Sequence, residues 1–147
     1  MRAVVQRVSR ASVEVGAECV GKIGKGMLVL LCVLKGDTDA TALKMAEKLA
    51  ALRIFEDDAG KMNFALDPAG GEALVVSQFT LAADLKKGNR PGFDAAAPPE
   101  EAKRLCDAVV AELGKRVARK VSTGRFGAMM DVSLLNAGPA TFVLDVS

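Results

Sequence analysis

The sequence predicts an α/β fold in which antiparallel β-hairpins are combined with two helices. Valine-rich segments separated by glycines fill residues 2–34, and this pattern favours successive strands. Two later segments place apolar residues three and four positions apart, which is the spacing of one helix face. No repeat, linker or low-complexity segment interrupts the chain, so residues 1–147 are expected to form one domain with a substantial core.

The first third of the chain favours four strands. Valine and other apolar residues dominate each segment, and the second segment alternates apolar and polar residues. Glycines between the segments supply turns. The expected strands cover residues 3–8, 11–15, 19–23 and 27–34, with turns at 16–17 and 24–26.

A helix is expected after the fourth strand. Asp37 or Thr38 can cap its first turn, because a short oxygen-bearing side chain accepts a hydrogen bond from a free backbone N–H group. The apolar pattern ends near Leu52. The expected buried face consists of Leu43, Ala46, Leu49 and Ala50.

The rest of the chain predicts a buried strand, a loop, a second helix and two final strands. Residues 73–79 are mostly apolar, which favours a buried strand after Gly70 and Gly71. Residues 88–99 contain three prolines and form a loop, while Pro98-Pro99-Glu-Glu indicates a helix start. That helix is expected to bury Ala102, Leu105, Cys106, Val109 and Leu113. A short strand from 54, a turn at 57–60 and strands over 121–135 and 140–146 complete the prediction.

The composition excludes several classes of enzyme. The chain has no histidine, so Ser-His-Asp and Cys-His catalysis and histidine-ligated zinc sites are impossible within it. It also lacks any Cys-x-x-Cys motif, and we expect no metal or other cofactor. Chemistry must therefore use hydroxyls, carboxylates, basic side chains, backbone dipoles or groups of the substrate.

Cysteines and hydropathy indicate a cytoplasmic protein. Cys19, Cys32 and Cys106 are odd in number and widely spaced, and we expect buried free thiols. The longest apolar run, Met27–Leu34, is too short to span a bilayer, and the N-terminal residues lack the pattern of a signal peptide.

Basic residues gather in three places although the formal net charge is only +2. Each group taken alone is most simply a solvated face, but three groups together favour an anionic partner. The groups are Lys115, Arg116, Arg119, Lys120 and Arg125; Lys86, Lys87 and Arg90; and Arg2, Arg7 and Arg10.

Three segments could carry chemistry. Residues 77–84 lie where a buried strand gives way to a loop, and they supply hydroxyls, a carboxamide and backbone N–H groups, or form only a polar strand end. Residues 123–130 hold two glycines three positions apart, which indicates a bulge or a close backbone approach. Gly138-Pro139, between two strand-like segments, is most simply a turn.

Taken together, these segments resemble the D-aminoacyl-tRNA deacylase (D-tyrosyl-tRNA deacylase) family. The resemblance extends over nearly the whole chain as six ordered motifs, which makes it specific. The motifs are Met1–Val13; Leu52-Arg-Ile-Phe-Glu-Asp57 with Gly60-Lys-Met-Asn63; Ser77-Gln-Phe-Thr-Leu81; Ala97-Pro-Pro-Glu100; Thr123-Gly-x-Phe-Gly-Ala128; and Asn136-x-Gly-Pro-x-Thr141.

The resemblance implies β/β/α layers and a cytoplasmic homodimer that hydrolyses the ester between a D-amino acid and tRNA. It implies that Gly138-Pro139 is cis and enters the active site of the partner subunit, where its carbonyls exclude L side chains. Ser77, Gln78, Phe79 and Thr80 would form the catalytic wall that faces it. Arg7, Asn136 and Met130 would support the site. Ala82, Ala137 and Ala140 depart from the usual family residues.

The residues present allow two mechanisms. The backbone N–H groups of Phe79 and Thr80 are candidate donors to the oxyanion. Thr80 could attack as a nucleophile, but no base accompanies it in sequence, and we favour assistance by the 2′-hydroxyl of the substrate. Glycyl-tRNA, including glycine mischarged on tRNA-Ala, should also be cleaved, because glycine has no side chain to exclude. Lys86, Lys87 and Arg90 are candidates for tRNA phosphate contacts.

Two other functions fit the same residues. The chain could be an RNA-binding module without activity, in which case it would bind tRNA in a salt-sensitive way without cleaving the ester. It could also be a conventional hydrolase that uses Ser77 or Thr80 with Asp84, in which case serine-directed reagents would label it.

Overall fold

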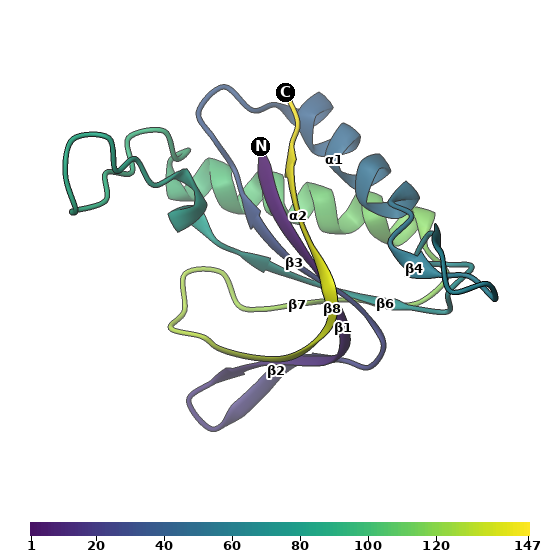
Figure 1. Ribbon diagram of the computed structural model, residues 1–147. Coiled ribbons are helices and arrows are strands. Elements are labelled where there is room, and N and C mark those ends of the chain that lie inside the picture. Colours follow the sequence, from purple (N-terminus) through teal and green to yellow (C-terminus); the bar gives the residue numbers. More distant parts are fainter.

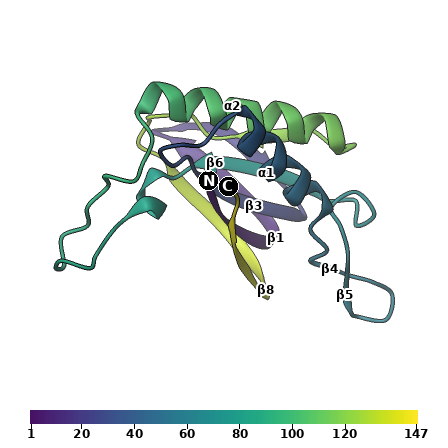
Figure 2. The same cartoon turned by 90° about the horizontal axis from the view of Figure 1, so that it is seen from above.

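The computed structural model describes residues 1–147 and contains a six-stranded sheet, a two-stranded sheet and two α-helices. Both helices pack on one side of the large sheet (Figures 1 and 2), so the predicted α/β class is confirmed. The elements are β1 Arg2–Val15, β2 Glu18–Ile23, β3 Gly26–Cys32, α1 Asp39–Ala51, β4 Phe55–Glu56, β5 Met62–Phe64, β6 Glu72–Ser77, the 3-10 helix η1 Phe79–Ala82, α2 Pro99–Arg116, β7 Val121–Thr123 and β8 Asp131–Asp145.

The connections explain the strand directions. The large sheet has the order β2-β1-β3-β6-β7, and β8 pairs with β1. Strand β1 is antiparallel to β2, β3 and β8, whereas β6 is parallel to β3 and to β7. A parallel pair needs a long crossover, and α1 and α2 lie within the two crossovers that lead into and out of β6.

The sheet curls until β7 approaches β2, which nearly closes a barrel. Gly21 permits this approach, because a Cβ atom at Gly21 would lie 2.2 Å from the carbonyl oxygen of Thr123. The hydroxyl of Ser122 donates to the carbonyl of Lys22 at 3.4 Å across the same junction. The interior is apolar and includes Val8, Ala11, Val13, Ile23, Leu28, Leu74 and Val76.

We expect Gly21→Ala to destabilise the protein by about 2 to 3 kcal/mol, since its methyl group would collide with the backbone of Thr123 and force β7 away from β2. Gly114→Ala is the control, because the Cβ atom there would contact nothing within 4 Å and alanine favours helix α2. Urea denaturation measures both free energies of unfolding. Equal stability of the two variants would contradict the close packing at Gly21.

The larger core lies between the sheet and the helices. Helix α2 buries the face predicted from its sequence, Ala102, Leu105, Cys106, Val109 and Leu113. Helix α1 buries Thr41, Ala42, Met45, Ala46 and Leu49. The prediction that Leu43 lies on the buried face is wrong, because Leu43 is 39% exposed and Met45 is buried instead. Thr38 is the N-cap and accepts from the N–H of Thr41, whereas Asp37 accepts from the N–H of Leu34.

The strand boundaries differ from the predictions in three places. Residues 3–8 and 11–15, expected as two strands, form the single strand β1. Strand β6 ends at Ser77 rather than at residue 79, and Phe79 is exposed. The expected strand over 121–135 is interrupted by residues 124–130, where Gly127 has a φ of +75°. A left-handed φ does not fit a strand, so this segment forms a loop.

The prediction of a turn between two strands at Gly138-Pro139 is wrong. Strand β8 stays paired with β1 on both sides of this dipeptide, with Thr141 opposite Gln6 and Asn136 opposite Val8. Residues 137–140 therefore lie opposite a single residue of β1 and bulge out of the ladder. The Gly138-Pro139 peptide bond is cis.

Cys32 and Cys106 are buried, as predicted, whereas Cys19 is exposed and does not fit that prediction. Cys19 lies on β2 and lines an open groove between β2 and β7. Burial raises the pKa of the Cys32 thiol and raises that of Cys106 to about 12. These two thiols therefore stay protonated at neutral pH. Neither helix has the length and hydropathy that a membrane span requires.

Candidate active site

The candidate catalytic segment, Ser77–Thr80, begins at the end of the buried strand β6. Ser77 ends β6, Gln78 caps the 3-10 helix η1, and Phe79 and Thr80 form its first turn. Two contacts to β3 anchor this turn. The N–H of Gln78 donates to the carbonyl of Leu31 at 2.7 Å, and the thiol of Cys32 lies 3.6 Å from the carbonyl oxygen of Phe79. The rigid sheet thus fixes the start of η1.

The N–H groups of Phe79 and Thr80 have no protein acceptor. This follows from their place in η1, because the first N–H groups of a helix have no preceding turn to bond with. Both residues are exposed, so a ligand oxygen could accept from these two neighbouring donors. The arrangement suits an oxygen that gains negative charge.

The hydroxyl of Thr80 accepts a hydrogen bond from the side-chain amide of Gln78 at 2.5 Å. No carboxylate or amine bonds to this hydroxyl. The carboxylate of Asp84 accepts instead from the backbone N–H of Lys86 at 2.9 Å, within its own loop. The structure therefore pairs Thr80 with no base.

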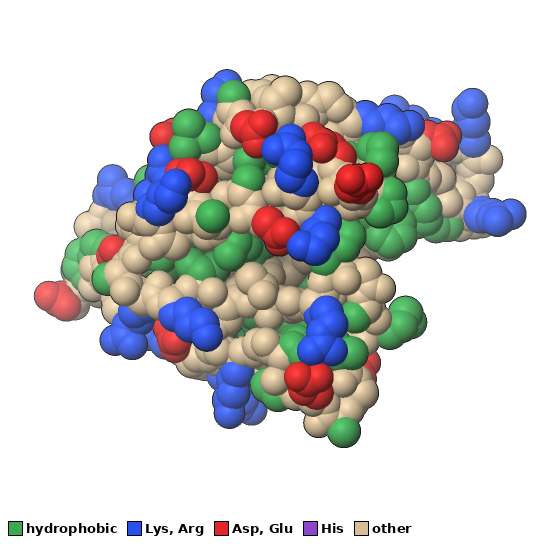
Figure 3. All heavy atoms as spheres, turned by 180° about the vertical axis from the view of Figure 1, so that it is seen from behind, with side chains coloured by type: hydrophobic (Ala, Val, Ile, Leu, Met, Phe, Trp, Pro, Cys, Tyr) green, Lys and Arg blue, Asp and Glu red, His purple; other side chains and the backbone are tan.

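Residues 83–97 form a loop that projects beside η1 (Figures 1 and 2). Reciprocal hydrogen bonds between Asp84 and Gly92, at 2.8 and 2.9 Å, close its base. The ring of Phe93 packs edge-on against Phe79, with 5.1 Å between the centroids. The predicted basic residues Lys86, Lys87 and Arg90 are all exposed on this loop, and Lys and Arg side chains stand out at its tip at the right of Figure 3.

Arg7 holds the bulge that contains Gly138. Its Nε donates to the carbonyl of Ala137 and its Nη1 to the carbonyl of Ile54, each at 2.8 Å. Its side chain is only 12% exposed, and Glu56 lies 3.9 Å from its Nη2. A cavity of about 440 Å³ adjoins this bulge, lined by Arg7, Val8, Ser9, Lys25, Phe55, Glu56, Ala137 and Gly138.

Asn136 and Met130, the other two supporting candidates, each lie against a glycine. A Cβ atom at Gly138 would be 2.8 Å from Nδ2 of Asn136, and one at Gly124 would be 2.7 Å from Sδ of Met130. The close approach predicted for the segment 123–130 is therefore present at Gly124. Met130 also packs against the barrel interior.

The structure does not bring the two halves of the predicted site together within one chain. Arg2 contacts η1 through the carbonyl of Leu81, and Arg7 contacts the bulge. These arginines are five residues apart on β1, roughly 17 Å along an extended strand. The cavity beside Gly138 includes no residue of 77–80.

Sequence patterns missed two residues of the site. Phe93 lies in a proline-containing loop with no periodic pattern, and its contact with Phe79 joins segments that the sequence keeps apart. Cys32 ends a buried strand, and no sequence pattern indicates that its thiol faces the carbonyl of Phe79.

The family model described as "D-Tyr-tRNA(Tyr) deacylase" matches residues 4–145. Proteins named "D-aminoacyl-tRNA deacylase" are similar over almost their full lengths. The one from Roseiflexus sp. is 59% identical over 99% of this chain and 93% of its own. The one from Geobacter sulfurreducens is 57% identical over 99% and 95%.

Two solved structures are similar in fold. One titled "c-Myc DNA Unwinding Element Binding Protein" has a TM-score of 0.93 and 41% identity, and the match covers 99% of this chain and 98% of that one. Another, titled "Structural Analysis of a probable eukaryotic D-amino acid tRNA deacylase", has a TM-score of 0.82 over 97% and 98% of the two chains. Its identity of 17% supports the fold alone.

Proposed function

Because this chain belongs to the D-Tyr-tRNA(Tyr) deacylase family, we propose that it hydrolyses the ester bond of D-aminoacyl-tRNA and releases the free amino acid and tRNA. The full-length match to relatives named for this activity carries the proposal. The two free N–H donors of η1 support it, because ester hydrolysis needs a group that stabilises the oxyanion.

In the proposed mechanism, the ester carbonyl lies against the N–H groups of Phe79 and Thr80. Attack on the carbonyl carbon places negative charge on its oxygen, and the two fixed donors stabilise that charge. Ser77 and Gln78 complete the wall, and the amide of Gln78 orients the Thr80 hydroxyl. The protein then contributes position and dipoles rather than proton transfer.

The substrate itself supplies assistance to the attacking water. A threonine hydroxyl is a weak nucleophile unless a base activates it, and Thr80 is hydrogen-bonded only to the amide of Gln78. The ribose 2′-hydroxyl adjoins the ester in every aminoacyl-tRNA and can accept a hydrogen bond from the attacking water. As it takes a proton from this water, it can pass its own proton to the 3′-oxygen, which leaves when the ester C–O bond breaks. A trapped acyl-enzyme on Thr80 would contradict this mechanism.

Selection against L-amino acids is assigned to Gly138 and Pro139, acting in a homodimer. Within one chain the bulge lies far from η1, so it reaches a catalytic wall only by entering that of a partner subunit. Gly138 and Pro139 are exposed and Arg7 holds the adjacent carbonyl, which suits a rigid projecting group. Their carbonyls would fill the space that an L side chain needs.

The projecting loop is assigned to the tRNA. Lys86, Lys87 and Arg90 are exposed, form no ion pair and extend from the end of the catalytic segment. Contacts with phosphates position an RNA without reading its sequence.

The deacylation rates of D-tyrosyl-tRNA and L-tyrosyl-tRNA with nanomolar enzyme test the proposal. We expect rapid loss of the D-ester and an intact L-ester. Cleavage of both would show that Ala137 and Ala140 leave the selection incomplete. Cleavage of neither, with salt-sensitive tRNA binding, would identify a binding protein instead.

Glycyl-tRNA is expected to be cleaved as well, including glycine mischarged on tRNA-Ala. Exclusion by backbone carbonyls acts on the side chain at the α-carbon, and glycine presents only hydrogen there. The measurement is the half-life of glycyl-tRNA with and without enzyme, beside L-alanyl-tRNA as the control. An unchanged glycyl-tRNA half-life would refute selection by side-chain exclusion.

A further inference from the structure

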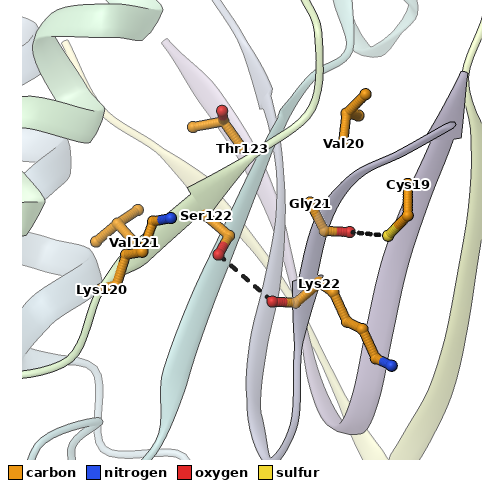
Figure 4. A pocket seen from close by; sticks show the side chains of 8 residues that line it. All are labelled: Cys19, Val20, Gly21, Lys22, Lys120, Val121, Ser122 and Thr123. Carbon is orange, nitrogen blue, oxygen red and sulfur yellow. Dashed lines mark hydrogen bonds between the residues drawn. The ribbon is translucent and has the colours of Figure 1, made fainter.

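A second surface, on the junction between β2 and β7, has the features of a phosphate-binding groove. The groove has a volume of about 300 Å³. Figure 4 shows its walls, with Lys22 and its neighbours on β2 and Lys120 and the strand β7 opposite. Its lining consists of Cys19, Val20, Gly21, Lys22, Lys120, Val121, Ser122 and Thr123.

Local contacts build this groove firmly. Gly21 brings β2 against the carbonyl of Thr123, and the hydroxyl of Ser122 donates to the carbonyl of Lys22. Next to them, Arg125 pairs with Glu18 at 3.0 Å and ties the loop after β7 to β2. The groove is therefore a fixed part of the barrel and not a gap between loops.

The charge of the groove favours an anion. Its lining contains two lysines and no acid, and neither Lys22 nor Lys120 forms an ion pair. Glu18, the nearby carboxylate on β2, is already paired with Arg125. The exposed hydroxyl of Thr123 adds a neutral donor. Ammonium and hydroxyl groups are the common partners of nucleic-acid phosphates.

The groove also leads toward the catalytic segment. Thr123 lies opposite Val75 of β6, and Ser77 follows two residues later, roughly 7 Å along the strand. Lys120 lies three residues before Thr123, next to the opposite end of β7. The groove therefore begins near Ser77 and runs from there along β7 to Lys120. An RNA strand whose 3′ end occupies the catalytic segment could continue into it.

We propose that the groove between β2 and β7 binds backbone phosphates of the tRNA acceptor stem, with Lys22 and Lys120 as its charged contacts. This inference rests on the proposed deacylase function and adds a second RNA contact, separate from the loop that carries Lys86 and Lys87.

The test compares the wild type with the double variant Lys22→Glu/Lys120→Glu on D-tyrosyl-tRNA between 50 and 200 mM salt. We expect KM to rise about tenfold with kcat unchanged, because the groups hold the RNA away from the reacting ester. The slope of log(1/KM) against log[salt] should become less steep by about 1 to 2, since each lost phosphate contact removes about 0.9. D-tyrosyl-adenosine, which lacks the acceptor-stem phosphates, should be cleaved equally by both proteins.

Lys48→Glu/Lys61→Glu is the matched control, because both lysines are exposed, form no ion pair and lie outside the groove. An equal rise of KM in this control would mean that any surface lysine attracts the tRNA to the same extent. It would refute the proposal that the groove binds phosphates. An unchanged KM and salt slope in Lys22→Glu/Lys120→Glu would also overturn it while leaving the deacylase function intact. Failure of the wild type to cleave either D-ester would refute the deacylase function and the groove with it.

Discussion

Phe79→Pro is expected to lower kcat for D-tyrosyl-tRNA by about 100- to 1,000-fold relative to Phe79→Ala, because it removes one oxyanion donor. Both variants lose the ring and its contact with Phe93. Only the proline variant also loses the backbone N–H group. The ratio of the two kcat values therefore isolates the contribution of that N–H group.

The structure can accept a proline at this position. The N–H of Phe79 has no protein acceptor, so no internal hydrogen bond is lost. Phe79 is the first residue of η1, a position at which proline is favoured. The preceding Gln78 lies outside the helical region, at φ −147° and ψ 76°, and avoids the clash that proline causes with a helical neighbour.

Thermal unfolding of the two variants provides the control for folding. Similar melting temperatures with a large kcat ratio would locate the oxyanion donor at Phe79. Similar kcat values would instead exclude this N–H group from catalysis. Single-turnover kinetics should show no acyl-enzyme in either variant.

Gly138→Ala is expected to reduce the ratio of D-ester to L-ester cleavage by at least about tenfold, which corresponds to about 1.4 kcal/mol. The new methyl group would lie 2.8 Å from Nδ2 of Asn136 and 3.5 Å from the backbone nitrogen of Ala140. The side chain of Asn136 must move, and we expect the carbonyl groups of Gly138 and Pro139 to shift with it. The φ of Gly138 is not positive, so the effect comes from the methyl group rather than from backbone strain.

A second substitution separates this effect from general damage. Asn136→Ala removes the atoms that the methyl group meets, so Asn136→Ala/Gly138→Ala should recover part of the discrimination lost in Gly138→Ala. Such non-additivity is expected only for residues in contact. Full discrimination in Gly138→Ala, measured with both tyrosyl esters, would remove Gly138 from the chiral selection.

Local patterns predicted the helices better than the strands. The two prolines and two glutamates at the start of α2 act within the first turn, and the buried face of this helix was predicted residue by residue. In α1 two apolar stripes compete, one with Leu43 and one with Met45. Propensity does not distinguish them, and packing against the sheet selects Met45.

The same limit explains the misplaced turn at Gly138-Pro139. Glycine followed by proline is a turn signal in any sequence, because both residues favour reversals. The bulge depends instead on β1, which pairs with β8 before and after this dipeptide. Those partners are more than a hundred residues away along the chain.

The sequence by itself limited the chemistry that is possible and predicted the two helices and the candidate segment Ser77–Thr80, because residue types and short-range spacing are local properties. The tertiary structure alone decided that Arg7 joins the carbonyls of Ile54 and Ala137, and that Phe93 packs on Phe79. It also decided that β2 and β7 enclose a basic groove. These contacts join distant segments, and they form only because burial of the shared core brings the strands and helices together.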